Sequence, residues 1–397
     1  MFLMHHAQTD RHLYKTKLER TLQRWLLAGY IVLLTGLFWL SNGSLYTKVY
    51  YGLIVAPAAI SLLAARGHIR LMIREPVVLA FLAFSTWLVI TLSWSSTDES
   101  VGSMAKRPLY VFMLFVACSF VACRDEQVLM KALRVAAAIG AAAALCNLIL
   151  FAIQMPSDGR LIGSGALRNP LLTSHVLGFF CTYWIATWIA KNERQEWLPI
   201  LLSCILLAAL LATGSRTPLL GLAVVSAWML LICTRRALYL VGALGTAAVI
   251  SAFYVPQLLL QRGVSFRPQL WADAWRQSLE QFWLGHGYDS RFVFQIAEIG
   301  YPLSDPHNIE LAVLLEMGLV GLVIWLALYA LTLFRCLELR QDRHFQIASA
   351  LVVYGFAAGL TEGSSFLSRP NESWFLLWIP FALVAALSIS RRKQTEQ

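Results

Sequence analysis

About twelve apolar stretches, each close to the length of a membrane-crossing helix, dominate this chain of 397 residues. A helix needs about 20 apolar residues to cross the ~30 Å hydrocarbon core of a bilayer. With 58% hydrophobic and 14% charged residues, the composition excludes an ordinary soluble domain and predicts an all-α polytopic membrane protein. The stretches lie at about 25–40, 49–65, 76–93, 108–123, 133–153, 170–190, 197–213, 217–233, 237–255, 308–334, 346–361 and 372–390, and Pro57 weakens the second of them.

The distribution of Lys and Arg predicts the orientation of the chain. When loops are assigned alternately with the N-terminus in the cytoplasm, most of the 32 basic residues fall on the cytoplasmic side. Both termini are therefore expected in the cytoplasm. Residues 1–24 are polar and basic and lack a small-residue cleavage site, which predicts a first helix that is retained. The net charge of +10 then reflects topology and attraction to the inner leaflet, so no nucleic-acid partner is expected.

This topology divides the chain into three segments. We expect residues 1–255 to hold helices one to nine, residues 256–306 to form a large outer loop, and residues 307–397 to hold helices ten to twelve. Large apolar side chains recur at helical spacing between residues 270 and 283, which predicts an amphipathic helix at the membrane interface. The seven cysteines lie in predicted spans or on the cytoplasmic side, so neither a disulfide framework nor a metal site is expected.

A polar island, "TGSRTPLL", forms a tight outer turn at residues 213–220. We expect Gly214 to end one helix, and Thr217 with Pro218 to cap and start the next. Arg216 would then lie beside a helix N-terminus, whose free N–H groups also favour an anion. The alternative is an arginine that extends to the lipid headgroups, which is common at the ends of spans.

A second island, "DPHNIELAVLLEMGLVG", begins at residue 305. Here Asp305 is expected to cap a helix that starts at Pro306, which places His307 in its first turn at the outer surface. Glu310 lies three residues further on, so it could orient the imidazole or keep it protonated. His307 and Glu310 could also bind a metal, but the sequence lacks a third ligand at a suitable spacing.

A histidine and several arginines at an outer membrane face suit glycosyl transfer from a polyprenyl diphosphate. The acceptor hydroxyl needs a general base with a pKa near the ambient pH, which His307 can supply. Fixed arginine donors can stabilise the charge that grows on the leaving diphosphate. The lipid tail of such a donor explains why the site is built on membrane helices.

The motif "HNIELAVLLEMGLVG" fits the pattern His-[Asn/Ser/Gln], nine residues, Gly, two residues, [Gly/Thr/Tyr]. It resembles the signature of the O-antigen ligase, O-antigen polymerase and O-oligosaccharyltransferase superfamily, with His307, Asn308, Gly318 and Gly321 in register. The "TGSR" turn and "SFRPQLWADAWRQSLEQFWLGHGY", with an Arg-x-x-x-Trp segment before Gly-x-Gly, are also similar to that superfamily.

The resemblance implies a GT-C-like enzyme of the bacterial inner membrane with an active site that faces the periplasm. It would transfer O-antigen from undecaprenyl diphosphate to lipid A core by inverting, metal-independent chemistry with no cofactor. His307, Arg216 and Arg267 match the catalytic positions, with Arg262 as a competitor for Arg267. The other candidates, all for substrate binding, are Asn308 and Glu310 beside His307, Arg160 and Arg168 in "RLIGSGALRNP", and Glu362 and Arg369 in "TEGSSFLSRPNESW".

Two alternatives remain open. An O-antigen polymerase or a protein O-oligosaccharyltransferase would use the same donor, although the length of 397 residues favours the ligase over the protein-modifying branch. A transporter with twelve helices would place its substrate site midway across the membrane between repeated halves. Against a transporter, the histidine and arginine motifs have no counterpart in the other half, and the ionisable groups cluster at the outer ends of the spans.

Overall fold

The computed structural model describes residues 2–157, 159–190, 197–232, 236–242, 245–246, 266–296, 301–363 and 365–395. For residues 2–16 and residue 66 it describes the backbone alone. Within these ranges the chain is helical, and extended pairing is confined to an isolated antiparallel bridge between Phe294 and Leu303. The all-α prediction is therefore confirmed for the described residues.

The helices follow the apolar stretches closely. They are α1 (Phe2–Thr35), α2 (Gly43–Tyr50), α3 (Ala56–Ala64), α4 (Arg66–Met72), α5 (Pro76–Thr91), α6 (Val101–Met104), α7 (Arg107–Ala122), α8 (Glu126–Gln154), α9 (Pro170–Ala190), α10 (Trp197–Thr213), α11 (Thr217–Ile232), α14 (Arg267–Ser278), α15 (Ile309–Glu338), α16 (Arg343–Gly359) and α17 (Trp378–Thr395). Short 3₁₀ segments cover Gly36–Phe38, Leu279–Gln281 and Glu372–Phe375. Every predicted span thus contains helix, although the span 237–255 falls largely outside the described residues and is described as helix only at 237–242 and 245–246.

Six of the described helical segments are long and apolar enough to cross a membrane, as expected for a multi-pass membrane protein. They are Lys17–Phe38, Gly43–Ala64, Val101–Ala122, Glu126–Gln154, Ile309–Glu338 and Glu372–Thr395. Three further apolar helices, Pro76–Thr91, Trp197–Thr213 and Thr217–Ile232, are shorter. The total of twelve spans, the three-segment division and the sidedness remain predictions.

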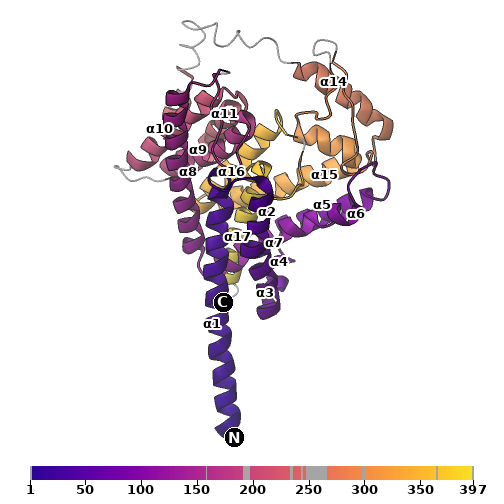
Figure 1. Cartoon of the computed structure of the whole chain (residues 1–397). Coiled ribbons are helices and arrows are strands. Elements are labelled where there is room, and N and C mark those ends of the chain that lie inside the picture. The colour runs from indigo at the N-terminus through magenta and orange to yellow at the C-terminus, as the bar shows by residue number, and fades with distance from the viewer. Residues whose placement is uncertain are drawn as a thin grey trace.

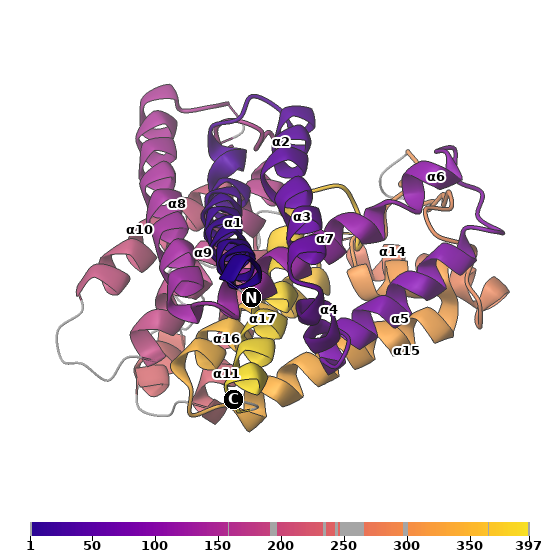
Figure 2. The same cartoon turned by 90° about the horizontal axis from the view of Figure 1, so that it is seen from below.

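The helices pack around one central helix, α17. Figure 2 shows α8, α9 and α10 on one side and α5, α14 and α15 on the other, with α1, α7 and α17 between them. The last of these, α17, is the most enclosed candidate span, because 94% of its 18-residue apolar window is buried. Its Trp378 packs edge to face against Phe81 of α5 and Trp325 of α15, at centroid distances of 5.4 and 5.8 Å.

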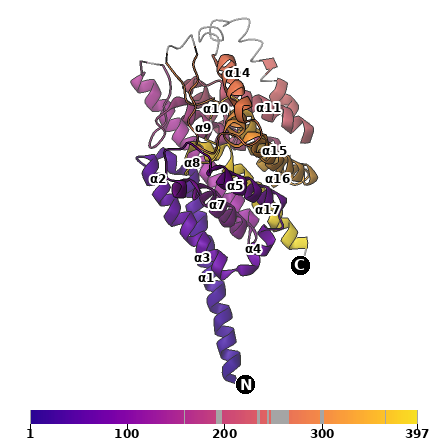
Figure 3. The ribbon, with the colours of Figure 1, turned by 90° about the vertical axis from the view of Figure 1, so that its right-hand side faces the viewer.

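The two ends of the molecule differ in character. Figures 1 and 3 show α1 reaching away from the helix bundle to the N-terminus, while α14 and the neighbouring loops lie at the opposite end. The C-terminal end of α17 also points away from α14. The placement of both termini in the cytoplasm and of the large loop on the outer side stays a prediction.

Pro57 does not interrupt the second apolar stretch as the sequence suggested. A proline removes a backbone donor and its ring crowds the carbonyl four residues earlier. Here α2 runs through a π-helical turn, Tyr51–Val55, into α3, and the N–H of Ala56 donates to the carbonyl of Tyr51. The extra residue in this turn widens the helix where the proline enters it.

The helix α15 is not one straight span. Gly318 has φ +66°, and its backbone is non-helical, so α15 consists of two helices, 309–317 and 319–338, joined at a bend. A Cβ on Gly318 would collide with the carbonyl oxygen of Trp283. Gly318 is therefore required by a backbone bend, because a residue with a side chain would be strained at this φ and would collide with the turn.

The turn at residues 282–287 supplies the hydrogen bonds that the bend removes from α15. The carbonyls of Leu315 and Glu316 accept from the N–H groups of His286 and Gly287, at 2.9 and 2.8 Å. The N–H of Leu319 donates to the carbonyl of Phe282 at 2.8 Å, and Val320 donates to Trp283 at 3.3 Å. A bent helix can stay buried only when such freed groups find partners. The glycine-rich turn and the bend in α15 thus stabilise each other through these hydrogen bonds.

The described part of the outer loop packs onto the first half of α15. Leu270 and Ala274 of α14 are fully buried with Phe294 and Leu315 in a small hydrophobic cluster separate from the main core. The predicted helix in this loop is confirmed, but its buried face contacts protein. Trp283, which the sequence placed at the end of this helix, is 66% exposed and is not part of the small hydrophobic cluster.

Candidate active site

His307 occupies a left-handed backbone conformation, with φ +50°. Such a conformation is unusual for a residue other than glycine. The N–H of His307 donates to Oδ1 of Asp305 at 2.7 Å, and Asn308 caps the helix by accepting from the N–H of Leu311 at 2.9 Å. The helix therefore begins at Ile309. The expectation that Asp305 caps it and that His307 lies in its first turn is wrong, because Asn308 takes the cap position.

Glu362 connects His307 with Arg267. Its Oε2 lies 3.1 Å from Nδ1 of His307, and its Oε1 accepts from Nη2 of Arg267 at 2.5 Å. The carboxylate side chain is 5% exposed, whereas the imidazole is 30% exposed. These three side chains come from the loop after α16, the segment before α15 and the start of α14. We call them the His–Glu–Arg group.

The pKa values of His307 and Glu362 shift in opposite directions. The hydrogen bond to Glu362 raises the pKa of His307 above its usual value and outweighs the opposing effect of burial. Burial alone would raise the pKa of Glu362, but the hydrogen bond with His307 and the charge of Arg267 hold the pKa of this carboxyl below its usual range. The carboxylate is thus ionised at neutral pH.

The hydrogen bond between His307 and Glu362 also fixes which ring nitrogen of the histidine carries the proton. An ionised carboxylate can only accept a hydrogen bond, so Nδ1 of His307 must carry the proton. In the neutral imidazole, Nε2 then holds a lone pair. His307 is therefore arranged to take a proton at Nε2 while Glu362 stabilises the imidazolium that results.

The Arg-x-x-x-Trp segment contacts both sides of this group. Arg267 and Trp271 lie one helical turn apart on α14, which places their side chains on one face. The indole N–H of Trp271 donates to the carbonyl of Pro306 at 3.1 Å, directly before His307. Arg267 holds the carboxylate partner of the same histidine. The helix α14 therefore positions His307 from two directions.

Arg216 lies on the turn beside the His–Glu–Arg group. Its carbonyl accepts from the N–H of Leu220 at 3.2 Å, so Arg216 takes the cap position that we had expected for Thr217. The hydroxyl of Thr217 contacts that of Thr361 at 3.3 Å, and Thr361 precedes Glu362. The side chain of Arg216 is exposed. The two polar islands of the sequence thus meet at the 361–362 loop.

Arg160 reaches the same turn, because its Nε donates to the carbonyl of Thr213 at 2.9 Å. Arg168 instead donates to the carbonyl of Ser41 at 2.9 Å, and Arg369 donates to Oγ of Ser103 at 3.1 Å. These contacts tie Arg168 and Arg369 to other loops of the same end. The competitor Arg262 lies outside the described residues.

Glu310 does not contact His307, contrary to the suggestion from their spacing. Its carboxylate is buried, and neither oxygen has a hydrogen-bond partner among the described residues. Asn308 serves mainly as a structural residue, since it caps α15 and donates through Nδ2 to the carbonyl of Leu360 at 3.0 Å. The imidazole of His286 lies in the turn at residues 282–287, where its Nδ1 is 3.1 Å from the carbonyl oxygen of Leu315.

One histidine was missed by the sequence analysis. His175 in α9 is 2% exposed, and neither ring nitrogen has a hydrogen-bond partner within the described parts of the chain. It lies close to the buried Glu362. A histidine inside the apolar run "LLTSHVLGFF" was the available signal, because ionisable groups within spans are rare.

No group of three or more His, Cys, Asp or Glu side chains among the described residues has metal-binding geometry. The metal-independent reaction stays a prediction.

A histidine paired with a buried glutamate and flanked by arginines at one end of a multi-pass helical membrane protein is compatible with the class of membrane-embedded transferases. Comparison with known proteins narrows this class. A family model described as O-antigen ligase matches residues 201–326, which include Arg216, Arg267 and His307. The chain is also 41% identical over 376 residues to an O-antigen ligase of Pseudomonas aeruginosa, and the match covers 94% of this chain and 93% of that protein. The chain belongs to the O-antigen ligase family.

Proposed function

We propose that this enzyme transfers O-antigen polysaccharide from undecaprenyl diphosphate to lipid A core at the periplasmic face of the bacterial inner membrane. The observation that carries the proposal is the Glu362 carboxylate, which bridges His307 and Arg267 beside the Arg216 turn. This arrangement combines a polarised base with fixed cations, which are the two requirements of the reaction.

In the proposed reaction, Nε2 of His307 takes the proton from an acceptor hydroxyl as its oxygen attacks the anomeric carbon of the donor sugar. The bond between that carbon and the diphosphate oxygen breaks, and undecaprenyl diphosphate leaves with both electrons. Attack opposite the leaving group inverts the anomeric configuration. General-base assistance of this kind contributes about 10²–10⁴ in rate.

Arg216 and Arg267 would stabilise the negative charge that develops on the leaving diphosphate. A guanidinium can hold two phosphate oxygens at once, and such fixed donors in a site shielded from water can each contribute about 3 kcal/mol. Arg216 is exposed on a helix N-terminus, where the helix dipole adds to its attraction for an anion. The charges of the protein thus replace a metal ion.

The substitution His307→Asn tests the proposal. Asparagine tolerates a left-handed backbone conformation, so the loop should keep its shape while the base is lost. In cells, polymer-bearing lipopolysaccharide should disappear from electrophoretic ladders and lipid-linked polymer should accumulate. An unchanged ladder with normal protein levels would refute the role of His307.

Reconstitution separates the ligase from its alternatives. Purified enzyme is given lipid-linked O-antigen together with either lipid A core or a second molecule of lipid-linked O-antigen. A ligase transfers glycan to lipid A core, whereas a polymerase lengthens the second donor. A protein acceptor in a third reaction covers the oligosaccharyltransferase branch.

A further inference from the structure

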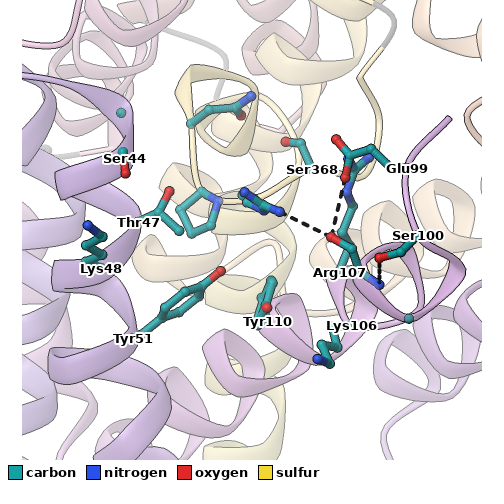
Figure 4. Close-up of a pocket in the computed structure, with 16 residues that line it drawn as sticks. Ser44, Thr47, Lys48, Tyr51, Glu99, Ser100, Lys106, Arg107, Tyr110 and Ser368 are labelled. Atoms are coloured by element: carbon teal, nitrogen blue, oxygen red, sulfur yellow. Dashed lines mark hydrogen bonds and ion pairs between the residues drawn. The ribbon is translucent and has the colours of Figure 1, made fainter.

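A concave site apart from the His–Glu–Arg group lies where helices α2, α6 and α7 meet the loop before α17. It encloses a cavity of about 810 Å³. We call it the outer groove and define it by Lys48, Tyr51, Lys106, Arg107, Tyr110 and Arg369. Figure 4 shows Thr47, Lys48 and Tyr51 on one side of the cavity and Glu99, Ser100, Lys106 and Arg107 on the other. The topology predicted from the sequence places all of these segments on the same side of the membrane as the His–Glu–Arg group.

The outer groove is strongly basic. Its lining contains the four cations Lys48, Lys106, Arg107 and Arg369, but the single carboxylate of Glu99. Arg107 is largely neutralised, since it lies 3.3 Å from Glu99 and 3.5 Å from Asp289. The other three cations have no carboxylate within 4 Å among the described residues. They converge from three separate segments, so the attraction for an anion is concentrated in one cavity.

The rest of the lining suits a sugar. The rings of Tyr51 and Tyr110 lie side by side, with centroids 4.8 Å apart, and offer apolar faces on which a sugar ring can stack. Ser44, Thr47 and Ser100 add hydroxyls that both donate and accept hydrogen bonds. A cavity of this size is typical of sites that enclose a ligand of two or more rings. Basic, aromatic and hydroxyl groups together favour a phosphorylated sugar over inorganic phosphate.

The outer groove is linked to the His–Glu–Arg group by one loop. Glu362 and Arg369 lie seven residues apart on it, so their Cα atoms are separated by at most about 25 Å. Tyr288 fastens the loop, because its hydroxyl accepts from Arg107 at 2.9 Å and donates to the carbonyl of Leu367. A single oligosaccharide could therefore contact both places.

We propose that the outer groove binds phosphorylated sugars of the glycolipid acceptor and thereby presents its hydroxyl to His307. This inference rests on the proposed function, which supplies a lipid-anchored oligosaccharide as acceptor. The phosphate chemistry is shared with phospholipid headgroups, which could also approach basic groups near the membrane surface. The tyrosines and hydroxyls favour the sugar.

Binding is measured with the full chain in nanodiscs of zwitterionic phosphatidylcholine. The probe is phosphorylated core oligosaccharide freed of its lipid, titrated before and after treatment with a phosphatase. Treatment should weaken binding at least about tenfold, as expected when charge-assisted hydrogen bonds are lost. The variant Lys48→Gln/Lys106→Gln/Arg369→Gln should show a similar loss, and phosphatase treatment should then have little further effect. Equal binding by this variant and the unchanged protein would overturn the proposal.

Two controls separate the alternatives. Arg276→Gln removes a cation that is 76% exposed on α14 and should leave oligosaccharide binding unchanged. A second set of nanodiscs contains phosphatidylglycerol. If the triple variant loses only affinity for this anionic lipid and keeps its affinity for the oligosaccharide, the outer groove is a lipid site and the proposal is wrong.

Steady-state kinetics distinguish this inference from the proposed function. The triple variant should raise KM for lipid A core at least about tenfold and leave both kcat and KM for the lipid-linked donor near their original values. His307→Asn should bind the core oligosaccharide normally but transfer nothing. If His307→Asn abolishes transfer but the triple variant leaves KM for lipid A core unchanged, the proposed role of the outer groove is refuted and the proposed function is not. Normal oligosaccharide binding without transfer by the unchanged enzyme would refute the proposed function alone.

Discussion

Oε2 of Glu362 lies 3.1 Å from Nδ1 of His307, although the two residues are 55 positions apart in the chain. The carboxylate is buried and also held by Arg267, so it fixes the imidazole in one orientation. The same contact raises the pKa of His307. We therefore propose that Glu362 is a positioning residue, whose removal should change the pH dependence of the reaction as well as its rate.

The variant Glu362→Gln should lower kcat/KM about 10²-fold and move its acid limb to lower pH. A base acts in its deprotonated form, so the acid limb follows the pKa of His307, which Glu362 raises above its usual value of 6.5. Without the carboxylate, burial and Arg267 lower that pKa. Initial rates measured across pH, with donor below KM, provide the test.

Glu280→Gln serves as the matched control, because Glu280 is 70% exposed and lies outside the His–Glu–Arg group. It should leave both the rate and the acid limb unchanged. A uniform loss of rate in Glu362→Gln, with the acid limb in its original place, would contradict the coupling between Glu362 and His307.

Arg216→Lys and Arg267→Lys should each reduce kcat by about 10²-fold or more. A lysine keeps the charge but cannot present two parallel N–H groups to a diphosphate. Arg276→Lys on the exposed face of α14 is the control and should behave as the unchanged enzyme. Transfer rates in reconstituted vesicles provide the measurement, and full activity of either lysine variant would reduce its arginine to a general electrostatic role.

Gly318→Ala should destabilise the protein by at least about 2 kcal/mol. An alanine at φ +66° is strained, and its Cβ would collide with the carbonyl of Trp283. Thermal unfolding in detergent should show a clearly lower midpoint. Gly67→Ala is the comparison, since nothing lies within 4 Å of a Cβ at that helical position and the substitution should be neutral or slightly stabilising.

Transfer by the purified enzyme should continue in excess EDTA. The proposed reaction relies on Arg216 and Arg267 for charge stabilisation, so chelation removes nothing that it needs. Rates are compared with and without EDTA, and then after addition of Mg²⁺ or Mn²⁺. A rate that falls with EDTA and recovers with one of these ions would show that a metal takes part.

The sequence predicted the positions of the helices well, because long apolar runs leave the chain few alternatives to helix. It also selected His307, Arg216 and Arg267, which the fold brings to one end of the molecule. Local spacing gave a wrong prediction for the carboxylate partner of His307. Glu310 is three residues from His307, but the carboxylate that contacts the imidazole is Glu362, and no rule of local spacing can identify a partner so distant in the chain.

The start and course of α15 were also misread. Pro306 looked like the first residue of a helix, yet the backbone of His307 is left-handed and the helix begins at Ile309. Gly318 lies within a continuous apolar run of the sequence, which gave no sign that the helix bends there. Its real role depends on hydrogen bonds to residues 282–287, which belong to another part of the chain. Such a bend has no signature in hydrophobicity.

The bend at Gly318 also separates anchoring from catalysis. A straight α15 of 30 residues would be about 45 Å long, whereas residues 319–338 alone measure about 30 Å, the thickness of the hydrocarbon core. The first half of α15 is thus free to follow the outer loop. The bend therefore leaves residues 319–338 as a segment long enough to cross the hydrocarbon core, while residues 309–317 pack against the described part of the outer loop.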